Sequence, residues 1–517
     1  MFAPVLTFWN RVLAVIGRVS MYRLAALALT LLSVIALALA AEGILAYSPR
    51  EMLASIAVLV GATTVTDLIA HRLVGRPWRP ESTVTTALIL FFVLRPTVEP
   101  LALLGLLLAA VAAAASKYLL VWRGRHVFNP AAVGVTVFTL AGLAAPGLGA
   151  AAWWVGTPFL AGPVLVLGLL VLVRTEKVRV VALFLVVAVA LFFVRAWSQY
   201  AASGMSFDAG ALFWQLLWSS PFLFLGLFMV SEPLTLPPRR WQQYVVALVI
   251  GTLAGWPIPV GSITLGQERA LLIGNLAAFC FAARSAVRLT LLDRVHATPT
   301  VRELTFRANH RFRFEPGQYL ELEVPHSHPD ARGTRREFSI VSAPEDLPRV
   351  TIALREGSNS SYKRALAAVA PGEALPVTGV WGDFVLPPNP ATPVVMVAAG
   401  IGVTPFVSQL RQLRHSGRYR DVVLVYVASV AAELAFRDDL AEAGIPVIVV
   451  CGTEPEALPA RWRWTGGGRL TADALLSDVP DIARRHAFVS GPPRIIAELT
   501  PALREARAIT TDAFAGY

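Results

Sequence analysis

The segment 396–406, MVAAGIGVTPF, joins an apolar run to two closely spaced glycines and a Thr-Pro pair. This pattern predicts a buried strand that ends in a tight glycine turn and opens a helix. Backbone N–H groups at such a turn can hold the phosphate of a dinucleotide. The spacing is Gly-x-Gly-x-x-Pro without the third glycine of the Rossmann fingerprint, so an ordinary turn explains the segment alone equally well. The candidate binding residues are Gly400, Gly402, Thr404 and Pro405.

Three stretches between the apolar runs of the N-terminal half carry polar residues typical of helix ends. They are RPESTVTTAL, HVFNPAAVGV and FMVSEPLTLPP, with the candidates Ser82, Thr83, Asn129, Pro130, Ser231, Glu232 and Thr235. Ser82 and Thr83 are read as helix caps, and Asn followed by Pro is a helix-start pattern. Helix N-termini present free backbone N–H groups, which suit flavin carbonyls or a phosphate. Simple capping is the alternative explanation.

The chain has 517 residues, which is too long for one core, so we expect at least two domains. It is 56% hydrophobic and 15% charged, with a mean hydropathy of +0.60, as is typical of membrane proteins. Charged residues become dense only from about Arg284 onward. Long apolar runs predict about ten membrane spans, near 23–47, 52–70, 82–98, 100–121, 130–146, 158–173, 180–196, 211–230, 243–257 and 270–283.

Basic residues between the apolar runs predict the orientation of these spans. Connections with two or three Arg or Lys alternate with connections that carry at most one. By the positive-inside rule, both ends of the membrane half lie in the cytoplasm. We therefore expect a multi-pass protein of the cell inner membrane, in contact with the lipid bilayer. The net charge of +11 then reflects topology, and no basic stripe interleaved with aromatics indicates a nucleic-acid partner.

The three polar stretches resemble the membrane flavin proteins of the Rnf complex and of the Na+-translocating NADH:quinone reductase. The resemblance covers roughly residues 50–280, and FNPA is its most specific part. It implies a non-covalent flavin, FMN or riboflavin, in the membrane domain. The implied contacts are Asn129, Pro130, Ser231, Glu232 and Thr235. Glu232 stands where the family usually has Asp.

The same resemblance implies a second flavin that is joined through phosphate to a threonine on the outer side. The candidate is Thr157 in AAWWVGTPFL. The family motif is Ser-Gly-Ala-Thr with an acid upstream, whereas this chain has Trp-Val-Gly-Thr and no acid nearby. Thr157 is alternatively a helix N-cap before Pro158. Haem would need histidine pairs on facing helices, and His71 and His126 do not supply them.

From about residue 287 the sequence changes to short strands separated by turns. VRELTFRA, GQYLELEVP, REFSIVSAP and RVTIALRE predict a small antiparallel barrel. TPVVMVAAG, DVVLVYVAS, IPVIVVCG and HAFVSGPP alternate with helical stretches such as 404–414 and 432–443, which predicts a parallel α/β lobe. The expected fold is a polytopic helical membrane domain (1–284), an antiparallel β-barrel (285–388) and an α/β lobe with a parallel sheet (389–517).

These motifs, in this order, resemble the ferredoxin–NADP reductase superfamily across nearly all of 287–517. The resemblance implies FAD in the barrel and NAD(P) in the lobe. Arg336 would pair with the FAD diphosphate, Phe338 would pack on the isoalloxazine ring and Ser339 would hydrogen-bond it. The full set of implied FAD contacts is Tyr319, Arg336, Phe338, Ser339, Gly357, Ser360 and Ser361. The last three stand in REGSNSSYKRAL, at an expected helix start that would make a second contact with the diphosphate.

The resemblance also assigns residues on the nicotinamide side. FVSGPPRII supplies Gly491 and Pro492, and Ser490 stands where many members have a Cys that tunes hydride transfer. Phe514 would cover the flavin ring, with a disordered terminus as the alternative. The catalytic candidates are therefore Ser490 and Phe514. The stretch after DVVLVYVAS lacks the arginine pair that usually meets a 2′-phosphate, which favours NADH over NADPH, although Arg437 lies near enough in sequence to substitute.

The sequence thus predicts an oxidoreductase that passes electrons from cytoplasmic NAD(P)H through FAD to a membrane flavin, and on to quinone or an extracytoplasmic acceptor. Two cysteines, Cys280 and Cys451, do not suffice for an iron–sulfur cluster or a zinc site, so electrons pass directly or through a partner electron-transfer protein. One alternative is a membrane-anchored diaphorase whose membrane half carries no redox cofactor. Another is redox-driven ion pumping, which the few intramembrane acids, Asp67 and Glu42, do not favour.

Overall fold

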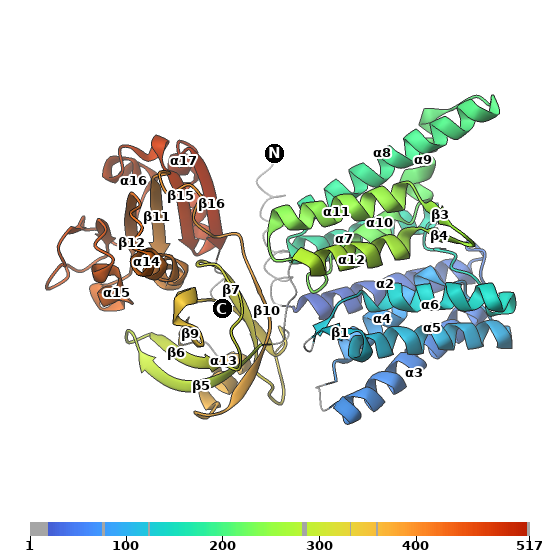
Figure 1. The fold of residues 1–517 in the computed structure, drawn as a ribbon, viewed down its shortest axis with the longest axis horizontal. Helices are drawn as coiled ribbons and strands as arrows, with labels where there is room; N and C mark the ends of the chain where they lie inside the picture. The colour runs from blue at the N-terminus through green and yellow to red at the C-terminus, as the bar shows by residue number, and fades with distance from the viewer. Residues whose placement is uncertain are drawn as a thin grey trace. The chain divides into compact units, whose positions relative to one another are not determined.

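The computed structural model describes residues 19–74, 78–122, 125–281, 287–330, 332–357 and 360–513. The chain divides into two compact units, Met1–Ser285 and Ala286–Tyr517. The first unit consists mainly of apolar helices, whereas the second contains two six-stranded sheets and short helices (Figure 1).

Five helices in the described part of the first unit are long and apolar enough to cross a membrane. They are α2 (Met21–Ala41), α3 (Pro49–Val74), α5 (Pro100–Leu119), α7 (Pro158–Thr175) and α8 (Val178–Ser203). At 1.5 Å per residue they measure about 27–39 Å, which matches a hydrocarbon core of about 30 Å. A sixth candidate is a helical pair bent by 49°. It comprises α9 (Ala209–Ser219), α10 (Phe222–Phe224) and the π-helical η2 (Leu225–Val230).

The prediction of about ten spans is therefore wrong. Four of the predicted runs form helices of only 14 to 16 residues: α4 (Pro80–Val93), α6 (Pro130–Ala144), α11 (Arg240–Gly255) and α12 (Gln267–Phe281). Helices of this length extend only about 21–24 Å, which is less than the hydrocarbon core of about 30 Å. The runs are longer in the sequence because apolar residues continue beyond the helix ends. Leu94, for example, follows α4 and forms an isolated β-bridge with Ala151.

Two hairpins and a buried loop complete the first unit. The hairpins are β1 (Val121–Trp122) with β2 (Arg125–His126), and β3 (Ile258–Val260) with β4 (Ile263–Leu265). The loop between α6 and α7 contains η1 (Pro146–Leu148) and buries Trp153 and Trp154. Trp154 packs against Phe91 and Phe92, with ring centroids 5.1 and 5.3 Å apart. This packing fixes the start of α7, where Thr157 lies.

An antiparallel sheet opens the second unit, as predicted. Its strands are β5 (Val287–His296), β6 (Val301–Ala308), β7 (Tyr319–Glu323), β8 (Arg335–Ser339), β9 (Arg349–Arg355) and β10 (Ala374–Trp381). They are hydrogen-bonded in the order β8-β7-β10-β5-β6-β9, and a bridge between Ile340 and Ile352 joins the two ends into a barrel. The four predicted strands are present, whereas β5 and β10 were not expected. The turn η3 (Pro344–Asp346) and helix α13 (Ser361–Ala368) lie between the strands.

A parallel sheet follows, also as predicted. Its strands are β11 (Val394–Ala399), β12 (Val422–Val427), β13 (Val447–Val450), β14 (Trp462–Trp464), β15 (His486–Gly491) and β16 (Ala508–Ala513). The accompanying helices in Figure 1 are α14 (Thr404–Ser416), α15 (Arg437–Glu442), α16 (Ala472–Asp478) and α17 (Pro493–Leu503). Short turns are η4 (Gly400–Val403), η5 (Ala431–Glu433) and η6 (Ile482–Arg484). The predicted helix at 432–443 is shorter because Phe436 takes a positive φ of 57° before α15.

The strand order of this sheet, β14-β13-β12-β11-β15-β16, reverses at β11. The chain first adds β12, β13 and β14 on one side of β11, and then adds β15 and β16 on the other. In open α/β sheets, ligands bind outside the carboxyl ends of the strands at such a switch point. The neighbouring strands β11 and β15 at this switch point end in Ala399 and Gly491. The fold therefore brings the two predicted nucleotide motifs to one edge of the sheet.

Candidate functional site

The turn after β11 packs tightly against the end of β15. Gly400 has a φ of +55°, a backbone conformation that favours glycine. A Cβ atom at Gly402 would lie 2.2 Å from the carbonyl oxygen of Ser490. Thr404 and Pro405 begin α14, and the Thr404 hydroxyl donates to a carbonyl of the turn at 3.0 Å. The turn therefore requires glycine, and it presents a helix N-terminus at the switch point.

Ser490 is fully buried at the end of β15, beside β11. Its hydroxyl has no hydrogen-bond partner within the described part of the chain. A buried hydroxyl without a partner lowers the free energy of unfolding by about 1–3 kcal/mol, and a bound ligand that hydrogen-bonds to it would recover this loss. A Cβ at the adjacent Gly491 would lie 2.7 Å from the Cβ of Ala399, and Pro492 is exposed. Phe514 lies outside the described residues.

Helix α14 joins the nucleotide turn to the barrel. The Ser408 hydroxyl donates to the carbonyl of Ser342 at 2.8 Å, and the Gln409 amide donates to the carbonyl of Phe384 at 2.7 Å. Both side chains on α14 are buried. Phe384 also packs against Phe406, with ring centroids 5.3 Å apart. These contacts could not be predicted, because helical spacing reveals burial but not hydrogen-bond partners.

Arg336 in β8 is held by several acceptors. Its Nη2 donates to both carboxylate oxygens of Asp330 at 2.7 Å, and its Nη1 donates to three backbone carbonyls. The guanidinium also lies 5.0 Å from the ring centroid of Tyr362. Burial raises the pKa of Asp330, but the hydrogen bonds and charge of Arg336 outweigh this effect and hold that pKa below its ordinary value. A diphosphate bound at Arg336 would have to share the guanidinium with Asp330 or displace the Asp330 carboxylate from it.

The surroundings of Arg336 are rich in positive charge. The pKa of Lys363 is lowered by burial and then by the charges of Arg332, Arg355 and Arg336. Several cations at close range are unfavourable unless an anion lies among them. The carboxylates of Asp330 and Glu356 already lie among them, and a diphosphate group would supply further negative charge.

The start of α13 lies beside this cationic region, and the predicted helix start is confirmed. Ser360 is the N-cap residue and Ser361 is the first helical residue. The Ser361 hydroxyl accepts a hydrogen bond from the backbone N–H of Asp330 at 3.0 Å and contacts Nε2 of His326 at 3.1 Å. Gly357 has a φ of +90°, which turns the chain from β9 towards the helix. The loop 326–330 and the start of α13 are thus tied together.

The end of β8 offers a second orphaned hydroxyl. Ser339 is buried, and its Oγ has no hydrogen-bond partner within the described ranges. Phe338 stacks on Tyr362 with ring centroids 6.0 Å apart. Tyr319 pairs with Ser339 across the strands and lies 6.4 Å from the ring of Trp381. An aromatic surface, an unpaired hydroxyl and a guanidinium on neighbouring strands fit the parts of a flavin dinucleotide.

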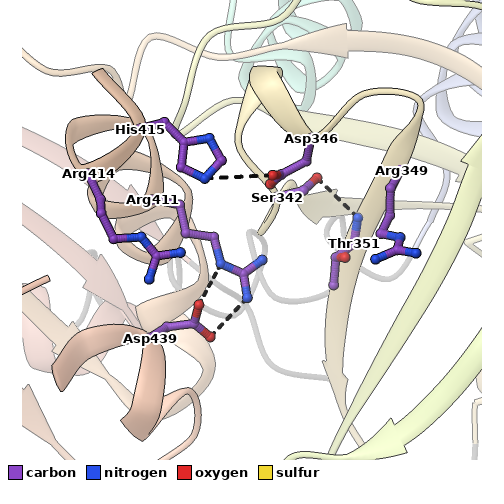
Figure 2. A pocket seen from close by; sticks show the side chains of 8 residues that line it. All are labelled: Ser342, Asp346, Arg349, Thr351, Arg411, Arg414, His415 and Asp439. Atoms are coloured by element: carbon purple, nitrogen blue, oxygen red, sulfur yellow. Dashed lines mark hydrogen bonds and ion pairs between the residues drawn. The ribbon is translucent and has the colours of Figure 1, made fainter. Parts of the chain in front are cut away.

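A polar pocket of about 300 Å³ lies elsewhere in the second unit, between barrel residues and helices α14 and α15 (Figure 2). Its lining residues are Ser342, Asp346, Arg349, Thr351, Arg411, Arg414, His415 and Asp439. Figure 2 shows Arg411 bound to Asp439 by two hydrogen bonds of 2.7 and 2.9 Å. Nε2 of His415 lies 3.9 Å from Asp346. None of the predicted cofactor residues lines this pocket, which borders the C-terminal half of α14.

In the first unit, Asn129 caps α6, as the Asn-Pro pattern predicted. Its Oδ1 accepts from the N–H of Ala132 at 3.1 Å, and its Nδ2 donates to Glu232 at 2.9 Å. Its backbone N–H donates to the side chain of Asn275 at 2.8 Å. Asn129 therefore connects α6, α12 and the segment after η2. Its side chain already serves as a cap and holds Glu232.

The remaining candidates of the first unit lie close to helix ends. Pro130 is the first residue of α6, and Ser231 directly follows η2 with its hydroxyl donating to a carbonyl of η2 at 2.7 Å. The Thr235 hydroxyl donates to the backbone carbonyl of Glu232 at 3.3 Å. Thr157 occupies the N-cap position of α7, but its side chain makes no capping hydrogen bond. Its hydroxyl is therefore not used as a cap.

The prediction that Ser82 and Thr83 cap a helix is wrong. Helix α4 begins at Pro80, so both residues lie within its first turn. The Thr83 hydroxyl instead donates to Oδ2 of Asp67 at 2.6 Å, and Nζ of Lys117 lies 3.0 Å from the same oxygen. The sequence revealed Asp67 and Lys117 only as isolated charges in apolar runs. Their pairing could not be read from it, because they are 50 positions apart.

Comparison with known proteins gives relatives for part of the chain, although no family model matches. The chain is 25% identical to the reductase component of propane 2-monooxygenase from Mycolicibacterium goodii over 193 residues, 36% of this chain and 53% of that protein. It is 33% identical to ferredoxin–NADP reductase B from Sorangium cellulosum over 145 residues, 28% of this chain and 58% of that protein. The chain spans about half the length of these curated relatives.

Among solved structures, the chain is similar to the Amycolatopsis cytochrome P450 reductase GcoB (TM-score 0.38, 25% identity, 44% of this chain and 69% of that chain). It is also similar to a ferredoxin NADP+ reductase from Neisseria gonorrhoeae with bound FAD and NADP (TM-score 0.37, 20% identity, 45% of this chain and 99% of that chain). The curated relatives include an NADPH oxidoreductase from Mycobacterium tuberculosis, 30% identical over 192 residues, 36% of this chain and 47% of that protein. In sequence, part of the chain is thus similar to ferredoxin–NADP reductases and to reductase components of oxygenases, in keeping with an NAD(P)H-dependent oxidoreductase.

Proposed function

We propose that this chain is a membrane-bound flavoprotein oxidoreductase. It takes electrons from NAD(P)H into FAD and passes them to a second flavin, FMN or riboflavin, in the first unit. From there the electrons reach quinone or an extracytoplasmic acceptor. The observation that carries this proposal is the fusion of a reductase-like domain to an apolar helical unit that holds a buried polar network around Asn129 and Glu232.

In the second unit, the FAD would be held at β8 and α13. Arg336, Ser360 and Ser361 would hold its diphosphate, and the Ser339 hydroxyl would hydrogen-bond the ring. Bound there, FAD accepts two electrons together and releases them singly. The protein residues contribute binding and orientation rather than acid–base chemistry.

The nicotinamide coenzyme would lie at the switch point of the parallel sheet. The turn with Gly400 and Gly402 would hold its diphosphate at the start of α14. Ser490 would contact the nicotinamide and supply the partner that its buried hydroxyl lacks. NADH is favoured over NADPH because no arginine pair follows β12.

Replacement of Ser490 by alanine separates a binding role from a packing role. Because the Ser490 hydroxyl has no partner among the described residues, the S490A variant should retain or slightly gain thermal stability. Hydride transfer to FAD, followed by stopped-flow absorbance, should slow by roughly 10-fold, as expected from loss of one hydrogen bond worth about 1.4 kcal/mol. An unchanged rate with unchanged stability would show that Ser490 is only a strand-end residue.

The membrane flavin is assigned to the cytoplasmic ends of helices near Asn129, Pro130, Ser231, Glu232 and Thr235. The FNPA motif and the clustering of these residues support this assignment. In this proposal, both ends of the first unit and the reductase domain lie on the cytoplasmic side of the cell inner membrane, in keeping with the alternation of basic residues between the apolar runs. Thr157, whose hydroxyl makes no cap, is the candidate for a covalently bound flavin on the outer side.

The direct test of this flavin site is the N129L variant, analysed for total flavin after purification in detergent. We expect the variant to lose the membrane flavin, while NADH still reduces FAD in the second unit. Because leucine also removes the amide that donates to Glu232 and the oxygen that caps α6, the E232Q variant provides a milder comparison: its amide keeps the shape and a hydrogen-bonding oxygen. If both variants keep the wild-type flavin content, the site is misassigned.

A second candidate function is a reductase that is only anchored by its first unit. It is favoured by the Asn129 side chain, whose amide groups are already engaged by the α6 cap and Glu232. In that case the wild-type protein contains FAD alone. Redox-driven ion pumping ranks below both, and Glu42, one of its two acid candidates, is exposed at the end of α2.

A further inference from the structure

A series of hydrogen bonds joins the end of β7 to the start of α13, beside Arg336. Nδ1 of His326 lies 2.8 Å from the backbone carbonyl oxygen of Val324, and Nε2 lies 3.1 Å from the hydroxyl oxygen of Ser361. That hydroxyl oxygen also accepts a hydrogen bond from the backbone N–H of Asp330 at 3.0 Å. His326 and Ser361 are both half-buried, so protons can exchange between this series and water.

The chemistry of the two side chains fixes the direction of each hydrogen bond. A carbonyl oxygen only accepts, so Nδ1 of His326 carries a hydrogen. Neutral imidazole has one N–H group, and Nε2 is therefore an acceptor. The Ser361 hydroxyl has a single hydrogen, which it donates to Nε2, while its oxygen accepts from Asp330. As long as His326 is neutral, Ser361 has no hydrogen left for a ligand.

A diphosphate at the start of α13 would need that hydrogen. Ser361 is the first residue of the helix and follows the N-cap residue Ser360. Phosphate oxygens accept hydrogen bonds, so a serine that contacts one must donate. If Nε2 of His326 also carries a hydrogen, it donates to the Ser361 oxygen, which has a second lone pair for it. The Ser361 hydroxyl can then donate to the phosphate.

We propose that His326 is a positioning residue that takes up a proton when FAD binds and thereby frees the Ser361 hydroxyl to donate to the diphosphate. This inference rests on the proposed function, which assigns the diphosphate to Arg336, Ser360 and Ser361. In the step, the lone pair of Nε2 forms an N–H bond with a proton from solvent, and no covalent bond of FAD changes. The proton returns to solvent when FAD leaves, so charge and atoms balance over binding and release.

The carboxylates nearest to these hydrogen bonds are already paired with arginines. Asp330 is held by Arg336, and a carboxylate oxygen of Glu323 lies 3.8 Å from Arg335. Burial raises the pKa of Asp330, but the hydrogen bonds and charge of Arg336 keep it below the ordinary value, so Asp330 is ionised near neutral pH. The surrounding elements also carry the charged or titratable residues Glu321, His328, Arg332, Glu337, Lys363 and Arg364. Because His328 is a second histidine on the same loop, the experiment needs it as a control.

The experiment measures FAD binding by the full-length protein in detergent, after removal of FAD, with flavin fluorescence as the signal. Histidine is mostly neutral above about pH 7, so in that range uptake of one proton should weaken wild-type FAD binding about 10-fold per pH unit. Titration calorimetry in buffers of different ionisation enthalpy should show uptake of about one proton per FAD. In the H326Q variant the amide can donate to Ser361 at every pH, so we expect FAD binding with little pH dependence and no proton uptake.

Two further variants test whether the effect passes through Ser361. His328 is exposed and has a φ of 58°, a conformation that asparagine tolerates, so H328N should keep the proton uptake and pH dependence of the wild type. S361A removes the hydroxyl but leaves His326 in place. It should bind FAD at least about 10-fold more weakly, because one hydrogen bond to a charged group is lost, and it should take up no proton.

The outcomes separate this proposal from the proposed function. A wild-type protein that binds FAD without proton uptake, or an H326Q variant with the wild-type pH dependence, would overturn the proposal. Proton uptake that persists in S361A would show that His326 acts on the diphosphate through its charge alone, which would overturn it as well. A protein that binds no FAD, or an R336M variant with wild-type FAD affinity, would instead refute the FAD site of the proposed function.

Discussion

The G402A variant should lose nearly all NAD(P)H-dependent reduction of FAD. The added Cβ would lie 2.2 Å from the carbonyl oxygen of Ser490 and 3.0 Å from the backbone nitrogen of Gly491. These are backbone atoms of a central strand, so the turn itself must move. A shift of about 1 Å in a binding element can cost roughly 100-fold in rate. We expect a loss of this size in stopped-flow reduction of FAD, without loss of bound FAD.

The control for this variant lies at the other end of the same helix. Gly417 follows α14 with a φ of +61° and open space around its Cα atom. Asparagine tolerates this left-handed conformation, so G417N should leave the rate of FAD reduction unchanged. If G402A also reduces FAD at the wild-type rate, the nucleotide does not bind at the turn after β11.

Replacement of Arg336 should have the second large effect, on FAD itself. The R336M variant removes the guanidinium from a region in which Lys363, Arg332 and Arg355 also carry positive charge. Hydrogen bonds to charged groups contribute about 1.5–3 kcal/mol each, so FAD affinity should fall by roughly 10- to 150-fold per bond lost. The measurement is the FAD content of the purified protein and its recovery on addition of free FAD.

Two further variants distinguish loss of a ligand contact from loss of folding. Arg335, the preceding residue, lies near Glu321 and Glu323 instead of Asp330, so R335Q should keep its FAD. The D330N variant weakens the internal partner of Arg336 and leaves the guanidinium freer for a diphosphate. We therefore expect D330N to bind FAD at least as well as the wild type. Normal FAD binding by R336M would contradict the assignment of Arg336 to the diphosphate.

The sequence predicted those features that depend on neighbouring residues. The glycine turn before Thr404, the Asn129 cap and the start of α13 all result from short patterns with one favoured backbone geometry. The parallel sheet was recognisable because its strands are continuous apolar runs. The helix lengths of the first unit could not be predicted, because an apolar run does not reveal where a helix ends and a loop begins. Helix α4, for example, ends at Val93 within an apolar run.

Features that depend on distant or context-dependent partners were missed. Asp67 and Lys117 are separated by 50 positions, and nothing in either apolar run indicates that they pair. Asp330 is only six positions from Arg336, but an acid in a loop is usually solvated, so its role as a partner was not apparent. The central strands β5 and β10 pair with each other although they lie far apart in the sequence. Such contacts become visible only in the folded chain.

The most direct test of the account is the flavin stoichiometry of the purified, detergent-solubilised protein, combined with an anaerobic titration with NADH. Flavin is measured before and after denaturation, so that released and covalently bound flavin are distinguished. We expect FAD together with a second flavin, and both should be reduced as NADH is added. A flavin that remains on the denatured chain would support Thr157 as its attachment point. A protein that contains and reduces FAD alone would contradict electron transfer into the first unit and leave an anchored reductase.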